Sequence, residues 1–182
     1  MKVIICPGIH APELTQSFVE GLKLFTICQS ENILIFPTED YPAYSGLHIL
    51  QFLGDRIPTY PPAHPLTSPL VFISFSAGVV GAYAAAIAWG QMGGCVKAFM
   101  ALDGWGVPLF GDFPIYRLSH DYFTHWSSAL LGGGEESFYA EPPVEHLELW
   151  RQPSLVRGWW VDKLGMRQRA TAAEFLTMLL QS

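Results

Sequence analysis

The feature that most constrains the fold is an apolar run interrupted by two serines. Residues 69–80 read PLVFISFSAGVV, so the chain is hydrophobic on both sides of a Ser-Phe-Ser-Ala-Gly step. Before the step, the apolar and partly β-branched residues are typical of a buried strand. After it, residues 78–90 are rich in glycine and alanine, and small side chains let a helix lie close to a sheet. The pattern predicts a strand that passes into a buried helix through a tight turn.

The same alternation extends along the chain. Short apolar strands are predicted at 2–6, 32–36, 69–74, 96–102, 114–119 and 137–142. Helices are predicted at 12–29, 46–54, 78–90, 154–164 and 171–180. Alternating strands and helices indicate an α/β fold, a three-layer sandwich with a mostly parallel sheet of about six strands. Ser154 and Thr171 are the expected N-caps of the last two helices.

Length and composition favour a single soluble domain over residues 1–182. Half of the 182 residues are apolar and only 14% are charged, which argues against disorder. The proline-rich stretch 57–69 is predicted to be an irregular connection within that domain. No signal peptide is expected at the N-terminus, and the apolar run 79–89 is shorter than the about 20 residues of a membrane-spanning helix.

Charge and cysteine content exclude several classes of function. The net charge is −6 and no run of Lys or Arg occurs, so nucleic acid is not an expected partner. The cysteines Cys6, Cys28 and Cys95 form no CxxC pair, which predicts neither a disulfide framework nor a thiolate zinc site. A reducing, cytoplasmic location is therefore expected.

The turn at Ser76 fits a nucleophile elbow. Such an elbow joins a strand to a helix, presents a serine at its tip and needs small flanking residues, here Ser74 and Gly78. The helix dipole then favours negative charge at the tip. The alternative is structural, because Ser74 and Ser76 are also suited to cap the following helix.

At this turn the chain resembles the α/β-hydrolase superfamily, and in particular its small single-domain members without a cap domain. The family pattern is Gly-x-Ser-x-Gly, and the chain has Ser74-Phe75-Ser76-Ala77-Gly78, with serine in place of the first glycine. The resemblance implies a serine hydrolase that forms an acyl-enzyme on Ser76 and needs no cofactor or metal. It also implies an acid and a histidine on later strands, in that order.

His146 is the base that this resemblance favours. It follows the third strand after the elbow, and the run HLELWRQPSLVRGWW resembles the closing stretch of the family. Asp121, after the second strand, is the expected acid, and Asp103 in ALDGWG is the alternative. The oxyanion formed on attack would be bound by the backbone amides of Ala77 and of either Ile9 or His10.

His120, Asp121 and His125 are candidate metal ligands, because histidine and carboxylate close together can bind zinc or iron. The two histidines are five residues apart and so do not share a helix face, and no further ligand is evident. No metal is therefore expected, and His125 is predicted to pack among its aromatic neighbours.

The substrate is expected to be a small carboxylic ester or thioester with an apolar acyl group. Six aromatic residues either line its pocket or cover the core, namely Trp105, Phe110, Phe113, Tyr122, Phe123 and Trp126. Exposed aromatic side chains would also suit a homodimer interface. The rival from another class is a binding or scaffold protein that keeps the fold without turnover. A nucleotide-binding domain is disfavoured, since neither GxGxxG nor GxxxxGK[ST] occurs.

Overall fold

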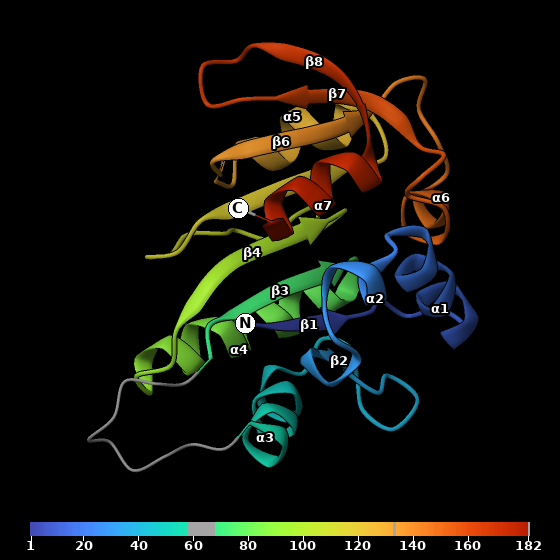
Figure 1. The fold of residues 1–182 in the computed structure, drawn as a ribbon. Helices are drawn as coiled ribbons and strands as arrows, with labels where there is room; N and C mark the ends of the chain where they lie inside the picture. Colours follow the sequence, from blue (N-terminus) through green and yellow to red (C-terminus); the bar gives the residue numbers. More distant parts are fainter. Residues whose placement is uncertain (58–67, 133, 182) are drawn as a thin grey trace.

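A central sheet runs through the computed structural model, which describes residues 1–57, 68–132 and 134–181. Within those residues eight strands form one sheet in the order β2-β1-β3-β4-β5-β6-β7-β8 (Figure 1). The strands are β1 (Lys2–Cys6), β2 (Ile33–Ile35), β3 (Leu70–Phe75), β4 (Val96–Leu102), β5 (Ile115–Ser119), β6 (Glu136–Ala140), β7 (Arg157–Val161) and β8 (Arg167–Thr171). The first six strands are parallel, β7 pairs antiparallel with β6, and β8 pairs antiparallel with β7. Most of the connection predicted at 57–69 lies outside the described residues.

Helices cover both faces of this sheet. They are α1 (Pro12–Gly21), α2 (Leu24–Ile27), α3 (Gly46–Arg56), α4 (Ala77–Gln91), α5 (Tyr122–Ala129), α6 (His146–Arg151) and α7 (Ala172–Gln181), with a 3₁₀ turn at Ser30–Asn32. Alternate residues of a strand point to opposite faces, and so Val3 and Ile4 of β1 belong to two different buried clusters. One cluster includes residues of α1, α6 and α7, and the other includes residues of α3 and α4. The α/β class predicted from the sequence is confirmed.

The C-terminal part of the sheet differs from the prediction. The sheet has eight strands where about six were expected, and the segment predicted as a helix at 154–164 contains strand β7. Its burial alternates along the strand, and Trp160 pairs with Phe138 of β6. Ser154 therefore caps no helix. By contrast Thr171 does cap α7, because its hydroxyl accepts the Glu174 amide at 3.1 Å while the Glu174 carboxylate accepts the Thr171 amide at 2.6 Å.

Strand β8 gave no signal in the sequence. It reads RQRAT, and its first three residues are exposed at the edge of the sheet. Charged side chains on an edge strand discourage pairing with another chain. The same charges remove the apolar alternation by which a strand is recognised.

Helix α4 packs as closely as its small residues predicted. A Cβ atom on Gly78 would lie 2.3 Å from the Pro7 carbonyl oxygen, and one on Gly81 would lie 2.5 Å from that of Ala43. Only glycine permits these backbone contacts. They fix the start of α4 against the loop that follows β1, at Pro7, and against the loop that precedes α3, at Ala43. No helix within the described residues has the length and apolarity to cross a membrane.

Candidate active site

Ser76 forms a strained turn between β3 and α4. Its φ is 53° and its ψ is −124°, a region that residues other than glycine rarely adopt. The Ser76 amide donates to the Leu102 carbonyl oxygen at 2.9 Å, which ties the turn to the end of β4. A Cβ on Gly8 would lie 3.0 Å from Ser76 Cβ, so the loop after β1 closes on the other side. The abrupt turn expected at position 76 is present.

Neither serine of this step caps the helix that follows. Ser76 stands at the N-cap position of α4, but its side chain makes no capping hydrogen bond. The buried Ser74 hydroxyl donates instead to the Met100 carbonyl oxygen on β4, at 3.0 Å. The structural alternative for the two serines is therefore wrong, and the Ser76 hydroxyl is left to another partner.

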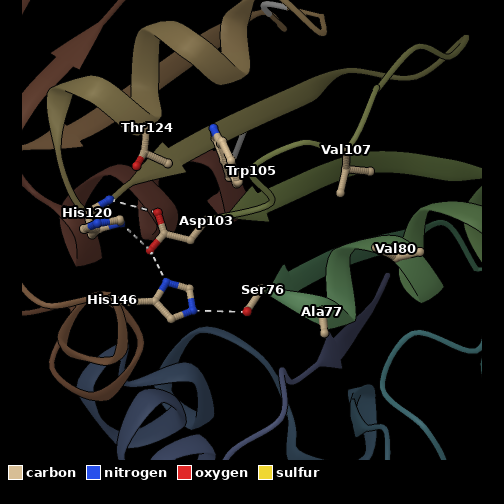
Figure 2. A pocket seen from close by; sticks show the side chains of 9 residues that line it. All are labelled: Ser76, Ala77, Val80, Asp103, Trp105, Val107, His120, Thr124 and His146. Atoms are coloured by element: carbon tan, nitrogen blue, oxygen red, sulfur yellow. Dashed lines mark hydrogen bonds and ion pairs between the residues drawn. The ribbon is translucent and has the colours of Figure 1, made fainter.

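That partner is His146. Its Nε2 lies 3.1 Å from Ser76 Oγ, across 70 residues of sequence (Figure 2). His146 is the first residue of α6, and its ring stacks on the Phe75 ring with 4.6 Å between centroids. Phe75 directly precedes Ser76, so one short segment supplies both the hydroxyl and the surface that orients the imidazole.

The other nitrogen of His146 contacts Asp103. The distance from Nδ1 to Asp103 Oδ2 is 2.8 Å. Asp103 directly follows β4, has a φ of 51°, and its side chain is only 1% exposed. Because β4 is the neighbour of β3 in the sheet, its carboxyl end lies beside the Ser76 turn. The structure thus joins Ser76, His146 and Asp103 in one chain of hydrogen bonds.

Asp121 is the acid expected from the sequence. Within the described residues, it makes no hydrogen bond or ion pair with His146. Its carboxylate caps α5 by accepting the Thr124 amide at 2.7 Å. The carboxylate that contacts His146 is that of Asp103, the alternative acid. The reason lies in the strand order, because β5 is one strand further from the Ser76 turn than β4 is.

His120, which was a metal-ligand candidate in the sequence, contacts the same carboxylate. Its backbone amide donates to Asp103 Oδ1 at 2.9 Å, and its Nδ1 lies 2.9 Å from Asp103 Oδ2. Burial raises the pKa of Asp103, but hydrogen bonds from His120 and His146 outweigh burial and bring that pKa below its ordinary value. The hydrogen bond to Asp103 in turn raises the pKa of His120, although burial opposes the shift. The only signal in the sequence was the position of His120 directly after a strand.

A cavity of about 370 Å³ opens beside these residues (Figure 2). Its polar side is formed by Ser76, Asp103, His120 and His146. The remaining lining residues are Ala77, Val80, Trp105, Val107 and Thr124. The cavity therefore places an apolar wall next to the Ser76 hydroxyl.

Of the six aromatic residues singled out in the sequence, Trp105 alone is part of that lining. Its indole nitrogen donates to Ser127 Oγ at 3.1 Å, which holds the ring toward α5. Phe113 packs against Phe99 of the core, with 6.3 Å between ring centroids. The other four are exposed to solvent, as Trp105 is, namely Phe110, Tyr122, Phe123 and Trp126.

Buried Arg117 of β5 ties a loop of the cavity wall, through Val107, to the loop after α5. Its guanidinium donates to the carbonyl oxygens of Gly132 at 2.5 Å, and of Val107 and Leu131 at 3.1 Å each. Burial lowers the pKa of Arg117 to about 10, so the side chain remains charged at neutral pH. A fixed cation thus connects the loop after β4 with the loop after α5.

The residues predicted to bind an oxyanion are divided between two cavities. Ala77 lines the cavity at Ser76, whereas Ile9 and His10 line a second cavity of about 400 Å³ together with Tyr41 and Tyr44. The loop that carries Ile9 and His10 still contacts the Ser76 turn through Gly8. The His10 ring packs 5.8 Å from the Phe75 ring, centroid to centroid.

The described residues contain one group of side chains with the spacing of metal ligands. It consists of Asp103, His120 and His146, whose ligand atoms lie within 4.8 Å of one another. Nδ1 of both histidines is hydrogen-bonded to Asp103 Oδ2. Of the three candidate ligands in the sequence, His120 and Asp121 are in contact, with 3.5 Å between Nε2 and Oδ2, but His125 packs against Tyr139 with 4.8 Å between ring centroids.

Comparison of the chain with protein-family models, with curated proteins and with solved structures found no match. Inference of function therefore depends on the geometry of the site.

Proposed function

We propose that the protein is a serine hydrolase with Ser76 as nucleophile, His146 as general base and Asp103 as the orienting acid. One observation carries the proposal: His146 bridges the two other residues, with Nε2 3.1 Å from Ser76 Oγ and Nδ1 2.8 Å from Asp103 Oδ2. A serine hydroxyl becomes nucleophilic when a base takes its proton, and the base needs a third group to fix its tautomer. Each of the three residues therefore has the contact that its role requires.

In this mechanism His146 Nε2 accepts the Ser76 proton as Oγ bonds to the carbonyl carbon of the substrate. Asp103 stabilises the imidazolium that forms. The Ala77 amide, at the N-terminus of α4, and one amide of the loop after β1 would stabilise the oxyanion. His146 then gives its proton to the leaving group, and an acyl group remains on Ser76. Water activated by the same histidine releases the acid and restores the hydroxyl.

The sheet and the strained turn also support membership of the α/β-hydrolase superfamily as part of this proposal. A nucleophile elbow is a sharp turn between a strand and a helix, and Ser76 occupies such a turn with positive φ. The serine that replaces the first glycine of the pattern is accommodated, because the Ser74 hydroxyl has a partner in Met100. This removes one reason to prefer a scaffold protein without turnover.

The substrate that the cavity suits best is a small carboxylic ester or thioester with an apolar acyl group. Val80, Trp105 and Val107 give the cavity an apolar surface next to Ser76. The volume of about 370 Å³ is at the small end of ligand cavities. Panels of p-nitrophenyl esters and thioesters of graded acyl length would define this preference.

The proposal is tested by labelling with a fluorophosphonate, which reacts with activated serines. We expect one label per chain, located on Ser76 by mass spectrometry, and no label in the S76A variant. The S30A variant is the control, because Ser30 is an exposed serine remote from this cavity lining. Labelling that persists in S76A, or its absence from the wild-type protein, would contradict the assignment.

A further inference from the structure

His120 binds the same carboxylate as His146, although the proposed mechanism gives it no task. Asp103 Oδ2 lies 2.9 Å from His120 Nδ1 and 2.8 Å from His146 Nδ1, and Asp103 Oδ1 accepts the His120 amide (Figure 2). His120 therefore supplies two of the three hydrogen bonds that the described residues make to this carboxylate. Most of what orients Asp103 comes from a residue outside the Ser76–His146 pair.

The backbone holds His120 in place for this task. Asp103 follows β4 and His120 follows β5, and these strands are parallel neighbours. The Asp103 amide donates to the Leu118 carbonyl oxygen at 2.8 Å, so the ends of the two strands are tied together. The two residues cannot separate without breaking the sheet at this point, which makes His120 a rigid support for the carboxylate.

The charges around His120 favour its protonated form. Its Nε2 lies 3.5 Å from Asp121 Oδ2, on the side of the ring away from Asp103. A doubly protonated ring can donate toward both carboxylates, whereas a neutral ring can donate toward one. The hydrogen bond that His120 donates to Asp103 raises the pKa of His120 most, burial opposes it, and the charges of Asp103, Asp121 and Glu145 raise it further.

The remaining titratable group that faces His120 is His146. The two rings are nearly perpendicular, at 81°, with 5.8 Å between their centroids. During attack His146 becomes an imidazolium, and Asp103 must stabilise it. A proton already on His120 would share that carboxylate and repel the second cation at short range.

We propose that His120 is a positioning residue, which holds Asp103 in place for His146 and, when it carries a proton, weakens the support that Asp103 gives. This inference rests on the proposed function of the same site. The site is then fully active only when His120 is neutral. Because the pKa of His120 is raised above its ordinary value of 6.5, activity should rise in a step as pH increases through that raised pKa.

Two substitutions separate positioning from protonation. In H120N the side-chain amide keeps an N–H donor near the position of Nδ1 and does not titrate, whereas H120A removes the donor. The measurement is the rate at which a fluorophosphonate labels Ser76 between pH 5.5 and 9, with a thermal melt of each variant to establish folding.

Above the pH of the step, we expect H120A to be labelled about 10- to 100-fold more slowly than the wild type, as for loss of a hydrogen bond to a charged group. H120N should remain within about threefold there, because its donor is retained. The rise of rate with pH that comes from the base His146 should remain in H120N, whereas the part that comes from His120 should be lost. The rate of H120N relative to the wild type should therefore increase about three- to tenfold toward low pH. A constant ratio of H120N to wild type at every pH would overturn the proposal.

A second measurement does not depend on hydrolysis. In the S76A protein, the imidazole ¹⁵N signals of His120 should titrate above 6.5, and the D121N substitution should shift that titration downward. Titration of His120 at or below 6.5 would overturn the proposal even if Ser76 is labelled. Failure of labelling in the wild type would instead refute the proposed function, and the ¹⁵N titration would still report whether His120 is protonated as inferred.

Discussion

The carboxyl ends of β4 and β5 provide an informative comparison. The strands are parallel neighbours, and each is followed by an aspartate at the same end of the sheet. Asp103 follows β4, is almost fully buried and binds two imidazoles. Asp121 follows β5 by one more residue, its side chain is 30% exposed, and it caps α5. The same chemical group is a candidate for catalysis in one place and a local structural element in the other. The difference is set by which strand lies next to the Ser76 turn.

Backbone conformation strengthens this contrast. Asp103 has a φ of 51° and Asp121 a φ of −154°. The first is unfavourable for most residues and tends to occur where surrounding structure enforces it, whereas the second is ordinary extended backbone. Ser76 shares this property with Asp103, so the two strained positions of this region are the two that His146 bridges.

The largest effect that we expect comes from D103N. This substitution keeps the shape of the side chain but removes the charge that would stabilise the imidazolium of the proposed mechanism. We expect kcat to fall by about 10³- to 10⁴-fold, as when the triad aspartate of a serine protease is replaced. The matched D121N variant should retain activity within about tenfold. Of the two imidazoles that bind Asp103, Asp121 contacts only that of His120, at Nε2 on the side of the ring away from Asp103, through a partly exposed ion pair. Ester hydrolysis by the two variants, side by side, checks this. An equal loss in both would mean that the comparison is wrong.

A smaller effect is expected at Trp105, which lies two residues beyond Asp103 and lines the cavity. W105A should raise KM for esters of longer acyl chains by about tenfold, since part of one aromatic surface is lost to the substrate. Acetyl esters should be nearly unaffected. A series of acyl lengths measures this, with F123A as the control, because Phe123 is exposed and does not line the cavity. Equal changes for all lengths would argue against an acyl site here.

At the end of β5 we expect mainly a change in stability. D121A removes the cap of α5 and should lower the free energy of unfolding by about 1 kcal/mol. Urea denaturation measures it, and D121N serves as the partner variant because asparagine also caps helices. An unchanged free energy of unfolding in D121A would show that the capping contact contributes nothing.

The smallest effect that we expect is a pH dependence of the free energy of unfolding. Asp103 and His120 contribute to it with opposite signs. The pKa of Asp103 is lowered from 3.8, so its contribution is present above that pH and is lost as pH falls through the lower folded value. The pKa of His120 is raised from 6.5, so its contribution is complete below 6.5 and is lost as pH rises through the folded value. Both contributions coexist between these limits, which is where His120 is charged and activity is expected to be reduced.

Denaturation curves between pH 3 and 9 test this relation. In H120N the decline on the alkaline side should be weaker than in the wild type, and the decline on the acid side should remain. Identical curves for the two proteins would show that His120 does not couple to folding.

The sequence predicted the parts of the site that depend on local order. A β-branched run, two small flanking residues and a helix rich in alanine specify the turn at Ser76 without any distant contact. The resemblance to a known family selected His146, which the structure brings to Ser76. The choice between Asp103 and Asp121 could not be made in this way, because it depends on strand order and on the local demand for a helix cap.

The C-terminal strands show the same limit in the fold. Strand β7 contains Trp159 and Trp160 in succession, so apolar residues occupy both faces and no clean alternation is visible. Strand β8 is an edge strand with charged residues, whose place in the sheet depends on pairing with β7. The contact of His120 with Asp103 was not predicted for a related reason, since the two residues are 17 positions apart in sequence.

The central claim is that Ser76 is the nucleophile and that His146 and Asp103 serve it. The most direct measurement is a crystal structure of the protein after reaction with a fluorophosphonate. The account predicts phosphorus bonded to Ser76 Oγ, His146 within hydrogen-bond distance of the adduct, and Asp103 at His146 Nδ1. An adduct on another residue, or an intact Ser76 after prolonged exposure to the reagent, would contradict it.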